Sequence, residues 1–215
     1  MKHNKNLNNI RREYKLNKLS EKNVRNNPFA QFSVWFSEVL KAGLIEPNSM
    51  ALSTTNKNKR PSARIVLMKD FDETGFTFFT NYESKKGKDL TENPFAALLF
   101  YWIELERQVR IEGRVKKLNK TQSELYFHSR SFESRLSAIA SAQSKIIIDR
   151  TYLEKKLQQV KAKHPDGNLP LPDYWGGYKL IPNYFEFWQG RENRLHDRIA
   201  YKWHKKNWKI VRLAP

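Results

Sequence analysis

The chain has 215 residues, no Cys and a formal net charge of +18, from 40 Lys and Arg against 22 Asp and Glu. Without Cys it has no disulfide, no thiolate metal site and no Cys nucleophile. Its length suffices for one full core, and no apolar run approaches the ~20 residues of a membrane-spanning helix. Residues 1–12 are polar and basic, unlike a secretory signal. We therefore expect a cytoplasmic protein that does not enter a membrane.

The excess of positive charge predicts attraction to polyanions, and nucleic acid is the first partner to consider. The charge is spread along the chain, however, and no zinc-finger spacing, RNA-recognition aromatic motif or basic helix with heptads accompanies it. Fixed cations also suit small phosphorylated ligands. The nucleic-acid interpretation thus rests on charge alone, and we expect no specific nucleic-acid partner.

The first 27 residues carry eight Lys or Arg against two Glu and few large apolar side chains, which predicts a mobile basic segment over residues 1–27. Asn27-Pro28 is typical of a helix start, because Asn caps the helix and Pro suits its first turn. Apolar residues then recur at helical spacing as far as Leu40, and Gly43 ends the helix. From Met50 onward the period changes to that of strands.

Strand patterns occupy residues 50–55, 63–69, 76–81, 95–102 and 108–118, with turns at 56–59 and 72–75 that predict two successive hairpins. Residues 84–93 are predicted to form a short helix that Ser84 caps. Residues 119–164 are predicted to be helical, with caps at Asn119 and Asp149 and a break at 129–131. After a turn-rich connector at 165–177, strands return at 178–181, 184–189, 199–204 and 208–213. This order predicts one mainly β domain over residues 28–215, a barrel-like antiparallel sheet with flanking helices, rather than a doubly wound parallel sheet.

The stretch from Glu186 to Arg198 is the richest in functional groups. It begins as an alternating strand and reaches Gly190, which permits a sharp exit. Arg194, His196 and Arg198 follow at alternate positions, so an extended chain would place all three on one face. Repulsion between them is easiest to explain if an anion binds there. A solvated basic strand that pairs with Glu192 and Asp197 is the alternative.

Four further groups suit a polar, anionic ligand. The strand Arg64–Lys69 begins and ends with a cation, which fits the wall of a pocket. A strand whose two end residues extend their charged groups into water would have the same pattern. The segment 80–86 leads into a helix start, where free N–H groups favour a phosphate. Tyr126, Arg130 and Ser134 would form a stripe of donors on a continuous helix, although an ordinary helix surface is the alternative. The uncharged donors of the fourth group suit polar ring edges: Gln108, Gln143 and Ser144.

Taken together, these groups closely resemble the pyridoxine 5'-phosphate oxidase (pyridoxamine 5'-phosphate oxidase) family, from about Arg11 to Pro215. Standard nucleotide, zinc-protease and serine-hydrolase motifs are missing from the sequence. The motifs that carry the resemblance are Arg11-Arg12-Glu13-Tyr14, Arg64–Lys69, Glu106-Arg107-Gln108-Val109, Tyr126–Arg130, Gln143-Ser144, Pro170-Leu171-Pro172 with Trp175-Gly176-Gly177, Phe187–Gly190, Arg194–Arg198 and Arg212–Pro215. Two positions depart from the family pattern: Lys85 replaces the usual Arg, and Ile146–Ile148 is more apolar.

The resemblance implies an FMN-binding split β-barrel homodimer with the flavin at the subunit interface, and no metal. It implies that the flavin is contacted by Arg64, Ile65, Val66, Leu67, Met68, Lys69, Phe79, Thr80, Lys85, Lys86, Gln108, Gln143, Ser144, Trp188 and Arg198. It implies that the substrate phosphate is held by Lys69, Tyr126, Arg130 and Ser134, that Arg11 and Tyr14 help cover the site, and that the catalytic residues against the pyridine ring are Arg194 and His196.

The reaction that this resemblance implies is oxidation of pyridoxine 5'-phosphate or pyridoxamine 5'-phosphate to pyridoxal 5'-phosphate, in vitamin B6 metabolism. A hydride would pass from C4' to flavin N5, and dioxygen would reoxidise the flavin to give hydrogen peroxide, with ammonia released from the amine. Two rivals remain open. One is a flavin-binding protein that has lost this substrate, and the other is a basic nucleic-acid binder without catalysis.

Overall fold

The structure is a computed structural model that describes residues 12–215, so the predicted site residue Arg11 lies outside the described residues. The helices are α1 (Pro28–Lys41), α2 (Lys85–Glu92), α3 (Lys120–Ser129), α4 (Phe132–Ala140) and α5 (Arg150–Lys163). The strands are β1 (Ser49–Thr55), β2 (Pro61–Leu67), β3 (Asp70–Asp72), β4 (Gly75–Asn81), β5 (Phe95–Trp102), β6 (Arg107–Lys117), β7 (Trp175–Gln189), β8 (Asp197–His204) and β9 (Asn207–Leu213). Short 3₁₀ turns cover Ile103–Leu105 and Glu192–Arg194.

Polar side chains set the helix starts that the sequence predicts. The Asn27 side chain accepts the Phe29 N–H at 2.8 Å, and Pro28 occupies the first helical position of α1. Ser84 caps α2, Asp149 caps α5, and Asn119 forms a capping box with Gln122 at α3. Each cap satisfies an N–H group that the helix leaves without a partner. The four predicted helix starts are therefore confirmed.

The strands form one sheet in the order β2-β1-β5-β6-β7-β4-β3, and β8 pairs with β7 and β9. The first predicted hairpin is confirmed, because β1 and β2 are antiparallel from Ser49↔Leu67 to Thr55↔Pro61. The second predicted hairpin turn, at 72–75, is also present, but the strand that it joins to β4 is the three-residue β3 and not 63–69; β4 also pairs with β7, and it is not paired with β2. Asp72 Oδ1 accepts the N–H groups of Thr74 and Gly75, and this tight turn folds only residues 70–72 back onto β4.

The last part of the sheet contains a longer strand than the sequence indicates. The two strands expected at 178–181 and 184–189 are a single strand, β7. Pro182 falls between the stretch of β7 that pairs with β4 and the stretch that pairs with β8. Neither of these two pairings therefore needs the backbone N–H that Pro lacks.

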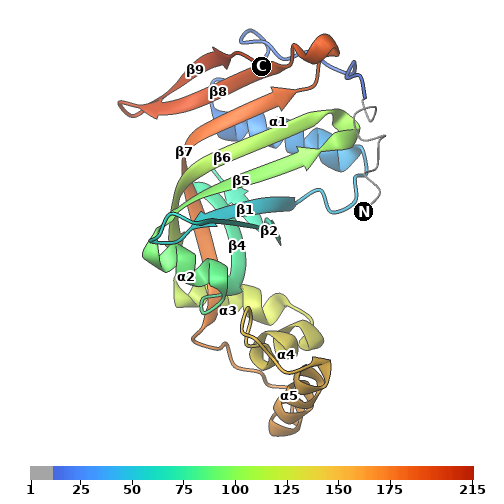
Figure 1. The fold of residues 1–215 in the computed structure, drawn as a ribbon, viewed down its shortest axis with the longest axis vertical. Coiled ribbons are helices and arrows are strands. Elements are labelled where there is room, and N and C mark those ends of the chain that lie inside the picture. The colour runs from blue at the N-terminus through green and yellow to red at the C-terminus, as the bar shows by residue number, and fades with distance from the viewer. Residues whose placement is uncertain (1–11) are drawn as a thin grey trace, which may run out of the picture. The chain divides into compact units, whose positions relative to one another are not determined.

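Two compact units make up the chain, and each is described by itself. Unit 1 comprises Met1–Pro47, of which residues 12–47 are described, together with Leu99–Ile111 and Tyr184–Pro215. Within it, α1 lies against the sheet (Figure 1), and its aromatic side chains contact those of the strands. The Phe32 ring centroid lies 5.1 Å from that of Phe100, and Trp35 meets Phe187 edge-on at 5.2 Å. These buried rings form the core of unit 1.

Unit 2 comprises Asn48–Leu98 and Glu112–Asn183. It contains β1–β4 and four helices, of which α4 and α5 lie side by side (Figure 1). A cluster of buried side chains joins these helices to the start of β7: Phe127, Leu136, Leu169 and Trp175. Among the described residues, no helix is both long and apolar enough to cross a bilayer. The predicted single domain over 28–215 and the mobile segment 1–27 stay predictions.

Candidate functional site

A cavity of about 540 Å³ in unit 2 brings most of the predicted ligand-binding residues together. It is lined by Arg64, Ile65, Val66, Leu67, Lys69, Phe79, Thr80, Asn81, Lys86, Tyr126, Arg130, Ser131, Ser134, Gln143 and Trp175. We call it the unit 2 cavity. Its described lining contains four cationic side chains and no carboxylate. Such a lining attracts an anion, because no carboxylate of the described wall offsets the cations, and only Arg64 has a described carboxylate behind it, that of Asp89 at 3.9 Å.

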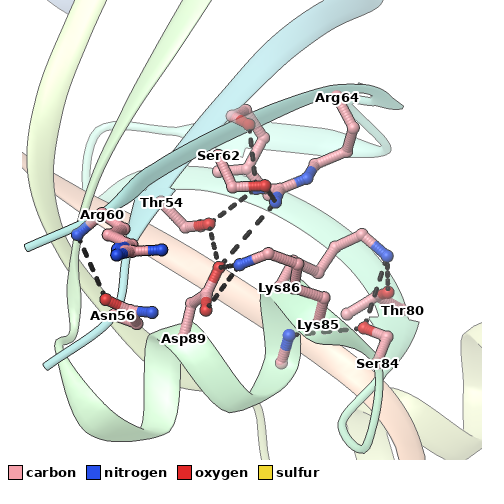
Figure 2. Close-up of polar contacts among 12 residues, drawn as sticks. Thr54, Asn56, Arg60, Ser62, Arg64, Thr80, Ser84, Lys85, Lys86 and Asp89 are labelled. Atoms are coloured by element: carbon pink, nitrogen blue, oxygen red, sulfur yellow. Dashed lines mark hydrogen bonds and ion pairs between the residues drawn. The ribbon is translucent and has the colours of Figure 1, made fainter. Parts of the chain in front are cut away.

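Lys86 is the most perturbed cation of this wall. Its ammonium donates to Thr80 Oγ1 at 3.0 Å and to Gln143 Oε1 at 2.9 Å, and Thr80 in turn donates to Gln143. Figure 2 shows the Lys86 side chain reaching from α2 toward Thr80 and Ser84. Burial, and next the charge of Arg64, lower the pKa of Lys86 to about 8. The two cations therefore already destabilise each other, which a bound anion would relieve.

Arg64 is held in place by neighbouring oxygens. Its guanidinium donates to Thr54 Oγ1 at 2.7 Å, to the Leu52 carbonyl at 3.1 Å and to Ser62 Oγ at 2.6 Å (Figure 2). The Thr54 hydroxyl donates onward to the buried carboxylate of Asp89 at 2.8 Å. Burial lowers the pKa of Arg64. The guanidinium is thus preorganised on the wall of the cavity rather than mobile in solvent.

Aromatic rings form a second wall of the unit 2 cavity. Tyr126 stacks on Phe79 with 3.8 Å between ring centroids, and both rings lie nearly parallel to Trp175. The Arg130 guanidinium lies over the Trp175 ring at 4.8 Å, and burial lowers its pKa. Its Nη1 atom is buried without a hydrogen-bond partner among the described residues. A buried donor of this kind is costly unless a ligand satisfies it.

Tyr126, Arg130 and Ser134 do not lie on one continuous helix, and the predicted break near Ser131 is confirmed. The helix breaks where the sequence predicts, because Arg130 has an extended backbone after α3 and Ser131 caps α4 by accepting the Ser134 N–H. Tyr126, Arg130 and Ser134 nevertheless line the same cavity. The turn between α3 and α4, and not the spacing along one helix, therefore brings the three donors to the same cavity.

Of the predicted flavin contacts that belong to unit 2, three do not line the unit 2 cavity. Lys85 and Ser144 line an adjacent cavity of about 350 Å³, together with Gln143. The Lys85 ammonium lies 3.2 Å from both carboxylate oxygens of Asp89, as expected for an i,i+4 pair on α2. Met68, which directly follows β2, is buried and does not line the unit 2 cavity.

A second cavity, of about 560 Å³, lies in unit 1 and collects the predicted ring-binding residues. It is lined by Arg12, Glu13, Tyr14, Arg191, Asn193, Arg194 and His196, and we call it the unit 1 cavity. His196 Nδ1 accepts the Arg191 backbone N–H at 3.1 Å, so the neutral ring carries its proton on Nε2. Burial, and next the charge of Arg194, lower the pKa of His196. The imidazole is therefore a neutral N–H donor at physiological pH.

The residues before His196 are not extended, which corrects the expected alternation of three cations along one strand. Asn193 and Arg194 both have left-handed backbone, with φ of 53° and 61°, within the 3₁₀ turn after Arg191. β8 begins only at Asp197. Arg194 and His196 thus line the cavity, whereas Arg198 does not. Successive left-handed residues cost free energy and are typical of sites where function requires the conformation.

Arg198 and Trp188 are cross-strand neighbours on β8 and β7. The Arg198 Nε–H donates to Glu186 Oε1 at 2.8 Å, and Arg110 contacts the other carboxylate oxygen at 2.6 Å. Burial of Glu186 opposes ionisation, but these hydrogen bonds outweigh it and lower the pKa of the carboxyl. Trp188 lies with its ring centroid 4.6 Å from that of His196. The remaining predicted contact of this unit, Gln108, is half-buried on β6 and lines neither cavity.

Sequence reasoning missed several residues of the two walls: Asn81, Ser131 and Trp175 in unit 2, and Arg12, Glu13, Arg191 and Asn193 in unit 1. Trp175, Arg12 and Glu13 belong to motifs quoted for the family resemblance, so this signal was available. Ser131 was recognisable only as part of a helix break. Asn81 lies in the predicted segment 80–86, and Arg191 and Asn193 lie in the predicted stretch 186–198, but no pattern singles out these three residues within them.

The fold is that of a mainly β protein of antiparallel split-barrel class, with a cationic cavity in unit 2 and a cavity in unit 1 that is lined by Arg194 and His196. The Pyridoxamine 5'-phosphate oxidase family model matches residues 36–164, and the model of the Pyridoxine 5'-phosphate oxidase C-terminal dimerisation region matches residues 175–215. The chain belongs to the pyridoxine/pyridoxamine 5'-phosphate oxidase family and is an enzyme of the oxidoreductase class.

Known relatives agree with this assignment. The chain is 56% identical to a pyridoxine/pyridoxamine 5'-phosphate oxidase of Herminiimonas arsenicoxydans, over 96% of this chain and 98% of the relative. It is 52% identical to the protein of the same name from Trichormus variabilis, over 96% and 97%. The crystal structure of PhzG from Burkholderia lata, in complex with tetrahydrophenazine-1-carboxylic acid, matches with a TM-score of 0.87 at 30% identity, over 93% of this chain and 99% of that one.

A more distant solved structure supports the fold alone. It is a pyridoxamine 5'-phosphate oxidase-related, FMN-binding protein of Nostoc punctiforme, with a TM-score of 0.69 at 18% identity, over 86% of this chain and 97% of that one. The fold class expected from the sequence, an antiparallel split β-barrel with flanking helices, is confirmed.

Proposed function

We propose that this enzyme is an FMN-dependent oxidase that converts pyridoxine 5'-phosphate or pyridoxamine 5'-phosphate to pyridoxal 5'-phosphate. Dioxygen is the electron acceptor, hydrogen peroxide is released, and the amine substrate also yields ammonia. The observation that carries this proposal is the unit 2 cavity, whose four cations face no carboxylate in its lining and whose Arg130 has a buried Nη1 without a partner among the described residues. Phosphorylated ligands satisfy such a wall.

The residues present fit FMN. The fixed guanidinium of Arg64 and the ammonium of Lys86 suit its phosphate, while Thr80 and Gln143 supply neutral donors and acceptors beside them. The other proposed contacts are Ile65–Lys69, Phe79, Lys85, Gln108, Ser144, Trp188 and Arg198. Bound FMN would supply the acceptor for a hydride from the substrate C4' carbon and would pass the electrons to dioxygen.

The protein's own part is binding and orientation. Lys69, Tyr126, Arg130 and Ser134 anchor the 5'-phosphate, because they supply two cations and two hydroxyl groups to one cavity. With the phosphate anchored, the reacting C4' carbon is held at a defined place in the site.

Arg194 and His196 act on the pyridine ring. The neutral His196 presents its Nε2–H as a donor to a ring oxygen, since Nδ1 is already occupied by the Arg191 N–H. The Arg194 guanidinium covers the ring and fixes its reacting face, and Tyr14, with Arg11, helps cover the site.

In the proposed enzyme two chains form a cytoplasmic homodimer, and FMN lies at the interface between the subunits. The match of residues 175–215 to a dimerisation region supports the homodimer.

Peroxide release by the purified, FMN-supplemented protein in air tests the proposal. Release on addition of pyridoxine 5'-phosphate, with none from unphosphorylated pyridoxine and none without FMN, is the expected result. A protein that binds FMN but releases no peroxide with either phosphorylated substrate would be a flavin-binding protein with another substrate.

Two rivals make different predictions in the same preparation. The tetrahydrophenazine-1-carboxylic acid in complex with PhzG carries a carboxylate and no phosphate ester, so turnover of a ligand of that kind would not require a 5'-phosphate. A nucleic-acid function resting on the +18 charge would appear as polyanion retention that fades steeply with salt and needs no flavin.

A further inference from the structure

Glu106 is an unusual residue at the start of β6. It has left-handed backbone, with φ of 54°, and is only 3% exposed. Glycine adopts this conformation without strain, whereas Glu does not, and burying a carboxylate adds a desolvation cost. The side chain must therefore make interactions that Gly could not replace.

Those interactions hold the N-terminal segment of unit 1. Glu106 Oε2 accepts the Leu16 backbone N–H at 3.0 Å, across 90 positions of sequence, and Oε1 lies 3.6 Å from Arg12 Nη2. The Glu106 carbonyl accepts the Gly190 N–H at 2.8 Å. One residue thus joins the segment that carries Tyr14 to the end of β7, which leads into the unit 1 cavity.

Tyr14 lies tightly against the same place. A Cβ added to Gly190 would lie 2.7 Å from Tyr14 Cβ and Cγ and 3.1 Å from Glu106 Cβ, so glycine is required for this close approach. The Tyr14 ring meets Trp188 edge-on at 5.7 Å and His196 at 5.8 Å. Tyr14 therefore supports the imidazole that donates to the substrate ring.

We propose that Glu106 is a positioning residue for substrate binding. Its carboxylate holds residues 12–16 so that Tyr14 packs on Gly190 and closes one side of the His196 pocket. This role rests on the proposed function, in which the unit 1 cavity receives the pyridine ring, but the docking of the segment is measurable without turnover.

The test compares Glu106→Gly, Glu106→Gln and the wild type. Glu106→Gly removes the carboxylate, which costs stability, and also removes the strain of the left-handed backbone, which restores part of it, so its thermal unfolding should stay within a few degrees of wild type. Glu106→Gln keeps an acceptor for the Leu16 N–H and should behave close to wild type. Glu104→Gly is the matched control, because Glu104 is exposed in the preceding turn.

The first measurement is trypsin cleavage after Lys15 and Lys18 under native conditions, followed by mass spectrometry. Glu106→Gly should be cut roughly tenfold faster there than wild type, as expected for the loss of a hydrogen bond to a charged group. The second is steady-state kinetics with pyridoxine 5'-phosphate. The KM should rise roughly tenfold in Glu106→Gly, with FMN affinity unchanged and kcat much less affected.

Wild-type cleavage rates in Glu106→Gly would overturn the proposal, and so would faster cleavage with an unchanged KM, because the segment would then have no part in substrate binding. A wild-type protein without peroxide release would instead refute the proposed function. In that case faster cleavage of Glu106→Gly would still support the docking role of Glu106, and unchanged cleavage would overturn it.

Discussion

Lys86 gives the unit 2 cavity a pH dependence. Its pKa in the free protein is lowered to about 8 by burial and by Arg64. A phosphate dianion favours the ammonium form, and the phosphate of FMN stays doubly ionised above its second pKa of about 6. Below pH 8 Lys86 is already charged, whereas above pH 8 it must first take up a proton. FMN affinity should therefore fall as pH rises above about 8, by up to ~10-fold per pH unit.

Flavin fluorescence titrations at pH 7 and pH 9 measure this dependence. Lys86→Arg is the matched control, because its guanidinium remains charged over the whole range and should flatten the slope. An equal slope in the wild type and in Lys86→Arg would assign the titration to another group.

Replacement of Arg194 tests the proposal that the unit 1 cavity binds the pyridine ring. In Arg194→Ala the left-handed backbone is retained, since Ala meets the same restriction as Arg, and only the guanidinium is lost. Turnover should fall about 100-fold, because the ring is no longer held in its reacting orientation. The FMN content of the purified protein, measured by absorbance, should stay near the wild-type value. Undiminished turnover would remove Arg194 from the mechanism.

The break between α3 and α4 is the element on which the phosphate anchor depends. Ser131 accepts the Ser134 N–H at 3.3 Å and donates to Ser134 Oγ at 2.8 Å. Loss of a helix cap costs about 1 kcal/mol, so Ser131→Ala should lower the melting temperature by roughly 2–4 °C. It should also raise the KM for pyridoxine 5'-phosphate, since Ser134 loses its support.

Ser129→Ala provides the control for that measurement. Ser129 lies on the other side of the break, and its hydroxyl donates to the Tyr126 carbonyl at 2.8 Å. Both variants remove one exposed hydroxyl bonded to local groups. A KM that rises equally in both would mean that general loosening of the turn, and not the Ser131 cap, affects the phosphate.

Assembly is the question at the scale of the whole molecule. If FMN binds at a subunit interface, dissociation of the dimer and release of FMN are linked equilibria. Light scattering should give a mass of about twice the 25.6 kDa of one chain, and dilution should release the flavin in step with the fall in mass. A monomer that keeps FMN at full affinity would contradict the interface location.

Local chemistry determines much of this protein. Asn27, Ser84, Asn119 and Asp149 are recognisable as caps in the sequence because a cap depends on residues two or three positions away. The alternating apolar runs predict the strands because this pattern, too, depends only on residues close together in the sequence. The family motifs identify most residues of both cavities, including Arg130 and His196.

Tertiary structure decided the features that depend on distant residues. The partner of β4 is β7, about 100 residues later, and no turn signal encodes that pairing. Lys85 and Lys86 are neighbours in sequence, yet only Lys86 lines the unit 2 cavity, because Asp89 on the next turn of α2 holds Lys85. Glu106 joins Leu16 and Gly190 across most of the chain. The sequence by itself thus determined the fold class and the helix starts, whereas long-range packing decided which side chains meet.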